Sequence, residues 1–169
     1  ERVLDVGCGA GGSTLDAANR VGPRGSALGV DVDGFALAVA ERRATELGYD
    51  NVFFLQADAG RAPLDGSFDA IVSRFGLNEL ASDPASLSNL ARALRPGGQL
   101  AFVCARELSK NAWASVLLGA VAAIVPELAD APQTAFGLAD PDRVRDLVSR
   151  GGFTDIELAP LDEAVWVGD

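Results

Sequence analysis

The sequence contains no histidine, no methionine and only two cysteines among its 169 residues. Without histidine, a mechanism that needs imidazole as general base or metal ligand is excluded. The two cysteines, Cys8 and Cys104, each lie inside an apolar run, and two such thiols form no disulfide framework. No signal peptide is visible, and no cluster of cysteines or carboxylates points to a metal. We therefore expect a protein of the reducing cytoplasm that holds no metal.

Long hydrophobic runs and positive charge are also scarce. The longest apolar run, at residues 112–125, is shorter than the roughly 18 residues that span a bilayer, so we expect no membrane span. Lys and Arg number 14 against 24 Asp and Glu, which gives a net charge of −10. A field of this sign repels phosphate backbones and anionic membranes. We therefore expect no nucleic-acid partner, whereas a cationic small ligand is tolerated.

Patterns typical of buried strands alternate with helical patterns along the whole chain. Apolar runs predict six strands, at residues 3–6, 26–30, 51–56, 68–73, 99–104 and 153–161. Caps and spacing predict helices at 13–21 (with Ser13 and Asp16 as a capping box), 35–47, from Asp83 to the break at 96–98, 111–125, and from Asp140 to the glycines at 151–152. This order predicts an α/β fold, a doubly wound, mostly parallel Rossmann-like sheet with helices on both faces. We expect a single domain over residues 1–169, with ligands beyond the carboxyl ends of the strands.

The strongest motif is the glycine-rich turn at residues 5–12, Asp-Val-Gly-Cys-Gly-Ala-Gly-Gly, between the first strand and the first helix. Its G-x-G-x-x-G spacing matches the dinucleotide fingerprint, with Asp31 about 20 residues further on to bind a ribose hydroxyl. An acidic-x-G-x-G-x-G pattern, which starts at Asp5, fits equally well. A tight turn without any ligand is the third interpretation, since glycine also serves sharp turns alone.

Three acidic residues favour the second pattern. Asp5 lies two residues before the first glycine, where a carboxylate repels a diphosphate and attracts an ammonium group. Asp31 ends the second strand, and its two oxygens can accept both hydroxyls of a ribose. Asp58 ends the third strand, where it can accept a hydrogen bond from the exocyclic amine of adenine. Together they indicate an adenosine with a cationic tail and no phosphate.

With these residues, the sequence resembles the class I S-adenosylmethionine-dependent methyltransferases, and most closely their ubiquinone/menaquinone-biosynthesis-type group. The resemblance covers residues 2 to about 159 and rests on the segments 3–11, 29–33, 56–59, 68–76 and 94–98. It implies that the methyl group of S-adenosylmethionine is transferred to a small-molecule acceptor by in-line displacement, with S-adenosylhomocysteine as product. Members of this family also carry a seventh, antiparallel strand that we do not find here. Since methionine is missing even at position 1, we expect a truncated chain that lacks this strand.

The resemblance also implies which residues touch the cofactor. The glycine turn lies against the methionine part and the ribose, Val32 packs on the adenine, and Asp58 with the Ala59 backbone recognises the adenine edge. Arg74, through its backbone carbonyl, and Phe75 lie near the methionine tail and the transferred methyl. The full expected set is Asp5, Gly7, Cys8, Gly9, Gly11, Asp31, Val32, Asp58, Ala59, Arg74 and Phe75.

The acceptor side is less defined, because the sulfonium is already an activated methyl donor and no catalytic side chain is obligatory. Glu79 is a candidate base with Asn78 as its partner, and Arg106 is a candidate for pairing with an anionic acceptor. A solvated helix turn and a surface salt bridge are the simpler interpretations of Glu79 and Arg106. Residues 105–137 are expected to form a lid-like helical insertion, and Trp113 within it is a further candidate for contact with the acceptor. The apolar helix of this insertion is buried against substrate, against a partner subunit of a homodimer, or in the core.

Two other functions fit the glycine turn. One is an NAD-dependent oxidoreductase, against which stand Asp5, Asp58 and the lack of a second catalytic segment with Tyr and Lys or with His. The other is a non-catalytic S-adenosylmethionine-binding protein, which sequence alone does not separate from an enzyme.

Overall fold

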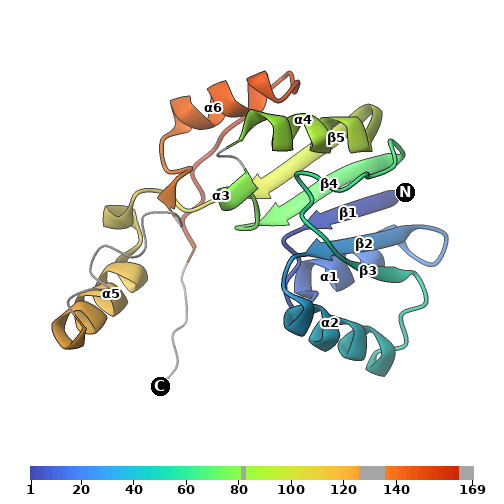
Figure 1. Ribbon diagram of the computed structural model, residues 1–169, viewed down its shortest axis with the longest axis horizontal. Helices are drawn as coiled ribbons and strands as arrows, with labels where there is room; N and C mark the ends of the chain where they lie inside the picture. Colours follow the sequence, from blue (N-terminus) through green and yellow to red (C-terminus); the bar gives the residue numbers. More distant parts are fainter. Residues whose placement is uncertain (81–82, 126–135, 164–169) are drawn as a thin grey trace.

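The computed structural model describes residues 1–80, 83–125 and 136–163, without the side chain of Glu79. Its centre is a parallel sheet of five strands in the order β3-β2-β1-β4-β5 (Figure 1). The strands are β1 (Arg2–Val6), β2 (Ser26–Asp31), β3 (Val52–Gln56), β4 (Phe68–Arg74) and β5 (Leu94–Val103). The order reverses between β1 and β4, and parallel α/β sheets bind ligands at the carboxyl side of such a reversal. The prediction of a Rossmann-like parallel sheet is confirmed.

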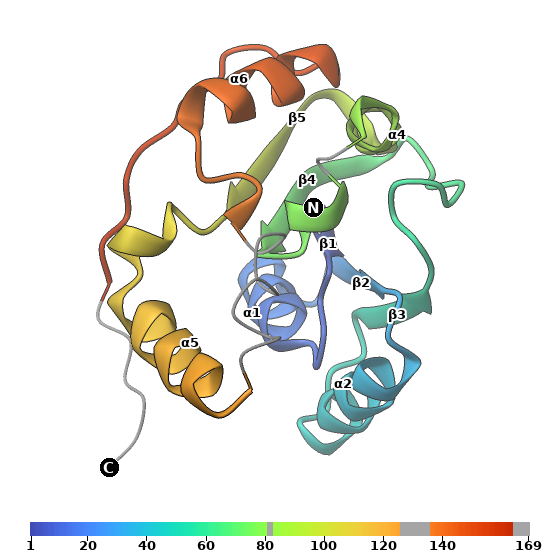
Figure 2. The same ribbon diagram turned by 60° about the vertical axis from the view of Figure 1, so that its left-hand side comes forward.

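Helices cover both faces of this sheet (Figures 1 and 2). One face carries α1 (Gly12–Val21) and α2 (Gly34–Glu46), and the other carries α4 (Pro84–Ala93) and α6 (Pro141–Arg150). The remaining helices are the short α3 (Leu77–Leu80), the 3-10 helix η1 (Leu108–Lys110) and α5 (Ala112–Ile124). Among the residues with described positions, no helix is long and apolar enough to cross a membrane.

The core lies between the sheet and its helices. Leu4 on β1 and Ile71 on β4 are register partners in the sheet, and both are fully buried. Leu87 of α4 and Val144 of α6 bury their side chains in the same cluster. Burial of an aliphatic side chain of this size contributes about 1.5–3 kcal/mol relative to exposure, so this cluster fixes the sheet that positions the site.

Most predicted helix starts are confirmed, with one informative exception. The side chains of Asp33, Asp83 and Asp140 cap α2, α4 and α6, respectively, by accepting backbone N–H groups of the first turn. The capping box predicted at Ser13 is wrong, because α1 starts after Gly11 and no side chain caps it. The Ser13 hydroxyl instead donates to Asp5, which lies across the turn on β1.

The predicted start of β5 at residue 99 is also wrong. Helix α4 ends at Ala93, before the predicted break at residues 96–98, and β5 already pairs at Leu94, which lies beside Phe68 of β4. The register then shifts, and the ladder resumes where Gln99 pairs with Ala70. The Pro-Gly-Gly segment therefore forms an irregularity inside an edge strand, where a missing N–H donor is tolerated.

The sixth strand predicted at residues 153–161 does not form. Phe153, Ile156 and Leu158 pack against the core as apolar residues of a strand do, but the chain makes no ladder with β5. A groove of about 730 Å³ lies between β5 and residues 152–158. Burial therefore follows the sequence pattern, whereas a strand also needs a partner within hydrogen-bonding distance.

Helix α5 extends beyond the carboxyl ends of the strands and contacts mainly η1 (Figure 1). Ala114 is its only buried residue, while Val116 is 74% and Ile124 is 82% exposed. The interpretation of this helix as part of the core is therefore wrong. Its burial against a substrate or a partner subunit stays a prediction. Residues 126–135 of the expected insertion lie outside the described residues.

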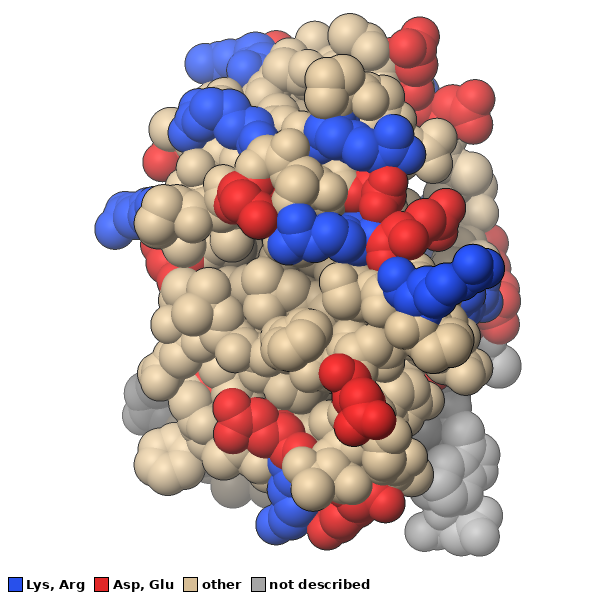
Figure 3. Space-filling view, turned by 90° about the vertical axis from the view of Figure 1, so that its right-hand side faces the viewer, with Lys and Arg blue, Asp and Glu red and all other residues tan. Residues whose placement is uncertain are grey.

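Ion pairs tie strands together at the opposite, amino end of the sheet. Asp69 on β4 accepts the Arg2 backbone N–H at 2.5 Å and pairs with Arg95 of β5 at 2.5 Å. These contacts hold the pKa of Asp69 below its usual value, first through the Arg2 hydrogen bond and then through Arg95. Figure 3, which views the right-hand side of Figure 1, shows basic and acidic side chains interspersed on this face. Exposed pairs of this kind contribute little to stability.

Candidate functional site

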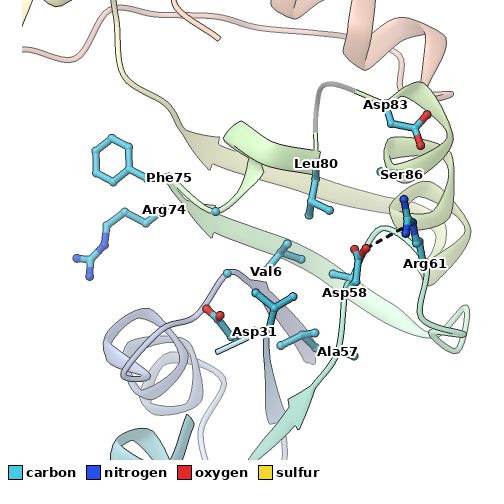
Figure 4. Close-up of a pocket in the computed structure, with 15 residues that line it drawn as sticks. Val6, Asp31, Ala57, Asp58, Arg61, Arg74, Phe75, Leu80, Asp83 and Ser86 are labelled. Atoms are coloured by element: carbon cyan, nitrogen blue, oxygen red, sulfur yellow. Dashed lines mark ion pairs between the residues drawn. The ribbon is translucent and has the colours of Figure 1, made fainter. Parts of the chain in front are cut away.

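A pocket of about 530 Å³ opens at the carboxyl ends of β1, β2, β3 and β4, where the strand order reverses (Figure 4). The predicted cofactor residues that line it are Gly7, Asp31, Val32, Asp58, Ala59, Arg74 and Phe75. Those of the predicted set that do not line it are Asp5, Cys8, Gly9 and Gly11. One pocket thus joins the ends of four strands, because the carboxyl ends of parallel strands lie at the same edge of a sheet.

The turn after β1 is built around Gly7. Its φ of +70° is in the left-handed region, and a Cβ atom here would lie 2.5 Å from the Cα of Gly76. The amides of Gly7 and Cys8 both donate to the carbonyl oxygen of Val30, at 2.9 and 3.2 Å. Because Gly76 follows β4, this close approach brings the ends of β1, β2 and β4 together and shapes the floor of the pocket.

Gly11 and Cys8 face neighbouring elements and do not line the pocket. A Cβ atom on Gly11, where φ is +79°, would lie 2.8 Å from the Cβ of Ala40 in α2. Cys8 is buried, and its sulfur lies 2.8 Å from the position that a Cβ on Gly29 of β2 would occupy. Neither residue lines the pocket, and their contact with a cofactor stays a prediction. Gly11 serves the turn that starts α1, and Cys8 serves its packing.

The reactivity of the Cys8 thiol also agrees with a role in packing. Burial, followed by the negative charges of Asp5 and Asp31, raises its pKa to about 12. A thiol with this pKa is protonated at neutral pH, and only the thiolate is a strong nucleophile. Cys8 is therefore not a candidate for covalent catalysis.

Asp31 ends β2 as a half-buried carboxylate with a fixed orientation. Its Oδ2 accepts the Gly9 amide at 2.7 Å, and its Oδ1 accepts the Asp33 amide at 2.9 Å. Each carboxylate oxygen has capacity for a further hydrogen bond. Gly9 thus acts on the site through Asp31, which its amide holds in place at the pocket wall.

Asp58 occupies the end of the pocket that lies beyond β3. Its Oδ1 accepts the Gly60 amide at 2.9 Å, and its Oδ2 lies 3.5 Å from Arg61 Nε, the pair marked in Figure 4. The carbonyl oxygen of Ala59 is engaged by the side-chain amide of Asn89 of α4 at 2.9 Å. Ala59 is therefore tied to α4, whereas Asp58 is held by its own turn, and the Asp58 carboxylate faces the cavity.

Asp5 lies at the end of β1, below the turn, and is fully buried. Its Oδ2 accepts the hydroxyls of Ser13 at 2.8 Å and Thr14 at 2.6 Å. Its Oδ1 has no hydrogen-bond partner among the residues that the structure describes. Burial raises the pKa of Asp5 above the ordinary 3.8, although the Thr14 and Ser13 hydrogen bonds and the charge of Arg74 act in the opposite direction.

This raised pKa makes the stability of the unliganded protein depend on pH. A carboxyl group whose pKa is higher in the folded state contributes stability that is fully present below its unfolded value, near 3.8, and is lost as pH rises through the folded value. We expect the variant Asp5→Asn to lack this loss. Urea unfolding of both proteins between pH 4 and 8 is the measurement. The stability of the wild type must fall relative to the variant as pH rises, and a constant difference contradicts this expectation.

Arg74 and Phe75 form the rim of the pocket at the end of β4. Phe75 has a φ of 67°, which is uncommon for a bulky residue, and its amide donates to the carbonyl of Val103 on β5 at 2.9 Å. Phe75 is 51% exposed. Strained backbone of this kind is concentrated at functional sites.

The candidate acceptor residues are not gathered in this pocket. Asn78 is half-buried in α3, the side chain of Glu79 lies outside the described residues, and Trp113 is 46% exposed on α5. Arg106 pairs with Asp162 at 3.2 Å and lines a separate cavity of about 520 Å³ beyond β5. The salt-bridge interpretation of Arg106 therefore agrees with the structure.

Sequence reasoning missed several pocket residues on the α4 side. Arg61, Leu80, Asp83 and Ser86 line the cavity beside Asp58. The sequence singles out Asp83 only as a helix cap. The segment after β3 packs directly against α4, since a Cβ atom on Gly60 would clash with Ser86. Contacts of this kind join distant segments, and no local pattern reports them.

Comparison with known proteins identifies the class. Over 101 residues, the chain is 39% identical to the ubiquinone/menaquinone biosynthesis C-methyltransferase of Pseudomonas savastanoi pv. phaseolicola, which covers 59% of this chain and 40% of that enzyme. Phosphoethanolamine N-methyltransferase 2 of Haemonchus contortus, solved with phosphomonomethylethanolamine and S-adenosylhomocysteine, superposes with a TM-score of 0.68 at 26% identity, over 93% of this chain and 34% of that one. The [4+2]-cyclase SpnF superposes with a TM-score of 0.53 at 34% identity, over 59% of this chain and 36% of that one.

The sheet order and the glycine turn thus define a fold of the S-adenosylmethionine-dependent methyltransferase class. Within this class, a family described as a methyltransferase domain matches residues 1–147, and the chain belongs to this family. The chain spans less than half the length of the curated relatives to which it is similar, 40% in the case of the Pseudomonas savastanoi enzyme.

Proposed function

We propose that the chain binds S-adenosylmethionine in the 530 Å³ pocket and catalyses methyl transfer to a small-molecule acceptor by in-line displacement. The observation that carries this proposal is that one cavity joins the Gly7 turn to the carboxylates of Asp31 and Asp58. We assign Asp31 to the ribose hydroxyls and Asp58 with Ala59 to the adenine edge. Val32, which is 63% exposed at the pocket wall, supplies an apolar surface for the adenine ring.

Asp5, at the end of β1 beside the glycine turn, fits such a ligand. Asp5 Oδ1, which has no partner among the residues with described positions, is a buried acceptor that a ligand ammonium group can satisfy, directly or through water. When bound, S-adenosylmethionine supplies an activated methyl group on a positively charged sulfur. The protein's contribution is then to bind and align, and positioning of this kind supplies about 7–11 kcal/mol of a barrier. Phe75, held at the rim by Val103, restricts the approach to this end of the pocket.

The proposed ligand must be distinguished from a dinucleotide such as NAD, which the same glycine spacing also fits. Arg74 at the pocket rim favours any anion, a diphosphate included, whereas the buried Asp5 disfavours one. We expect calorimetric titration to show binding of S-adenosylhomocysteine and none of NAD. Binding of NAD alone overturns the assignment.

A second candidate is a protein of this fold that binds S-adenosylmethionine without transferring its methyl group. It is favoured by the similarity to a solved protein described as a cyclase. Release of labelled methyl from S-adenosylmethionine, screened over quinols, phenols, amines and fatty acids, separates the two. Turnover of any acceptor supports the enzyme, and binding without turnover supports the second candidate.

For partners, we propose a small-molecule acceptor, no nucleic acid, and a homodimer that covers the exposed apolar side chains of α5. The acidic net charge of −10 supports the exclusion of nucleic acid. Val116 and Ile124, both largely exposed, support a covering partner for α5. We propose the cytoplasm as the location, since the two cysteines are free thiols.

A further inference from the structure

The charges that line the pocket are unevenly distributed. Its acidic side chains are Asp31, Asp58 and Asp83, and its basic side chains are Arg61 and Arg74. Arg61 is paired with Asp58 at the α4 side. In the part of the chain that the structure describes, Arg74 has neither an ion pair nor a side-chain hydrogen bond. Figure 4 shows it directed away from the Asp58–Arg61 pair, at the other end of the pocket.

The guanidinium of Arg74 lies at the start of α1. Its Nη2 atom is 3.6 Å from the position that a Cβ atom on Gly12 would occupy. Helix α1 is ten residues long, with no side-chain cap and no acidic residue in its first turn. The first amides of a helix have no partner within the helix, and its N-terminus carries partial positive charge. Arg74 and this helix end therefore form one anion-attracting position.

A buried acceptor of the opposite charge lies beside this position. Asp5 is fully buried, and its Oδ1 has no partner among the described residues. Ser13 and Thr14 of the first turn of α1 hold its other oxygen, so the carboxylate sits against the same helix end. The charge of Arg74 also lowers the pKa of Asp5, against the larger effect of burial.

An unpaired guanidinium and an unsatisfied carboxylate at one helix end match the two charges of an α-amino acid. We propose that the Arg74 side chain, with the N-terminus of α1, binds the α-carboxylate of the cofactor's methionine part and so selects for an intact amino-acid end. This inference rests on the proposed function. The expectation from the resemblance used only the backbone carbonyl of Arg74, whereas here its side chain is the determinant.

The test compares two ligands that differ by one group. S-adenosylhomocysteine carries both the ammonium and the carboxylate, and its decarboxylated analogue keeps only the ammonium. We expect calorimetry to show that Arg74→Ala weakens S-adenosylhomocysteine about 10- to 100-fold, the range of a hydrogen-bonded charge pair, and changes the analogue less than about 3-fold. Arg74→Lys keeps the charge without the planar fork, so part of the preference returns.

Arg61→Ala is the matched control, because it removes a cation from the same pocket at the opposite end. It should leave the ratio of the two affinities unchanged. If Arg74→Ala weakens both ligands equally, or weakens neither, Arg74 is only a counter-ion of Asp5 and the inference is overturned while the proposed function stands. If the wild type binds neither ligand, the proposed function itself fails.

Discussion

Replacing Asp31 with alanine is expected to weaken S-adenosylhomocysteine binding about 100-fold or more. We expect its carboxylate to accept two ribose hydroxyls, and each hydrogen bond to a charged group is worth about 1.5–3 kcal/mol. The same substitution frees the Gly9 amide, which donates to Asp31 Oδ2 at 2.7 Å, and so loosens the glycine turn. Calorimetric titration of the folded variant measures the effect.

Asp33→Ala is the control for this experiment. Asp33 lies two residues further along the chain and caps α2 by accepting the amides of Phe35 and Ala36, but it does not line the pocket. Its loss should destabilise the protein by about 1 kcal/mol and change the affinity by less than about 2-fold. If both variants bind equally well, Asp31 does not hold the ribose.

The sequence was sufficient to find the acids at the strand ends. Asp31 and Asp58 follow apolar runs whose lengths fix where each strand stops, and parallel strands bring their carboxyl ends to one edge. The ends of β2 and β3 follow from local pattern, so the pocket wall that these two strands form is predictable. The helix caps at Asp83 and Asp140 are predictable for the same reason, since a cap needs only its own first turn.

The sequence does not predict which residues of the tight glycine turn face the pocket and which face neighbouring elements. Gly7, Cys8, Gly9 and Gly11 are almost consecutive, yet only Gly7 lines the pocket, while Gly11 meets α2 and Cys8 meets β2. Each direction depends on positive φ angles that spacing does not encode. Ser13 shows the same limit, because a tertiary partner, Asp5, takes the hydroxyl that the local pattern assigned to a cap.

Residues 153–161 show that an apolar sequence pattern predicts which side chains are buried more reliably than it predicts strand pairing. The apolar positions Phe153, Ile156 and Leu158 pack on the core as the alternation indicates. A ladder also requires a neighbouring strand about 4.8 Å away, and here a groove separates this segment from β5. Pairing is a property of two segments and cannot be derived from one.

The largest effect on stability is expected for Gly7→Ala. Residue 7 has a φ of +70°, and left-handed backbone costs about 1–2 kcal/mol for a residue with a Cβ atom. The added atom would also lie 2.5 Å from the Cα of Gly76, and backbone cannot swing aside as a side chain can. Overpacking of this kind costs about 1–3 kcal/mol more, and the usual total stability is only about 5–15 kcal/mol. Urea unfolding should therefore show a loss of about 2–5 kcal/mol.

The variant Gly9→Ala separates the cost of the left-handed backbone from the cost of the steric contact with Gly76. Residue 9 also has a positive φ, of +52°, but a Cβ atom there meets nothing within 4 Å. The variant should therefore lose only the backbone contribution, about 1–2 kcal/mol. Gly7→Ala must also impair S-adenosylhomocysteine binding more strongly, because moving β1 away from β4 opens the floor of the pocket. Equal losses of stability in the two variants would show that contact between Gly7 and Gly76 is not what holds these strand ends together.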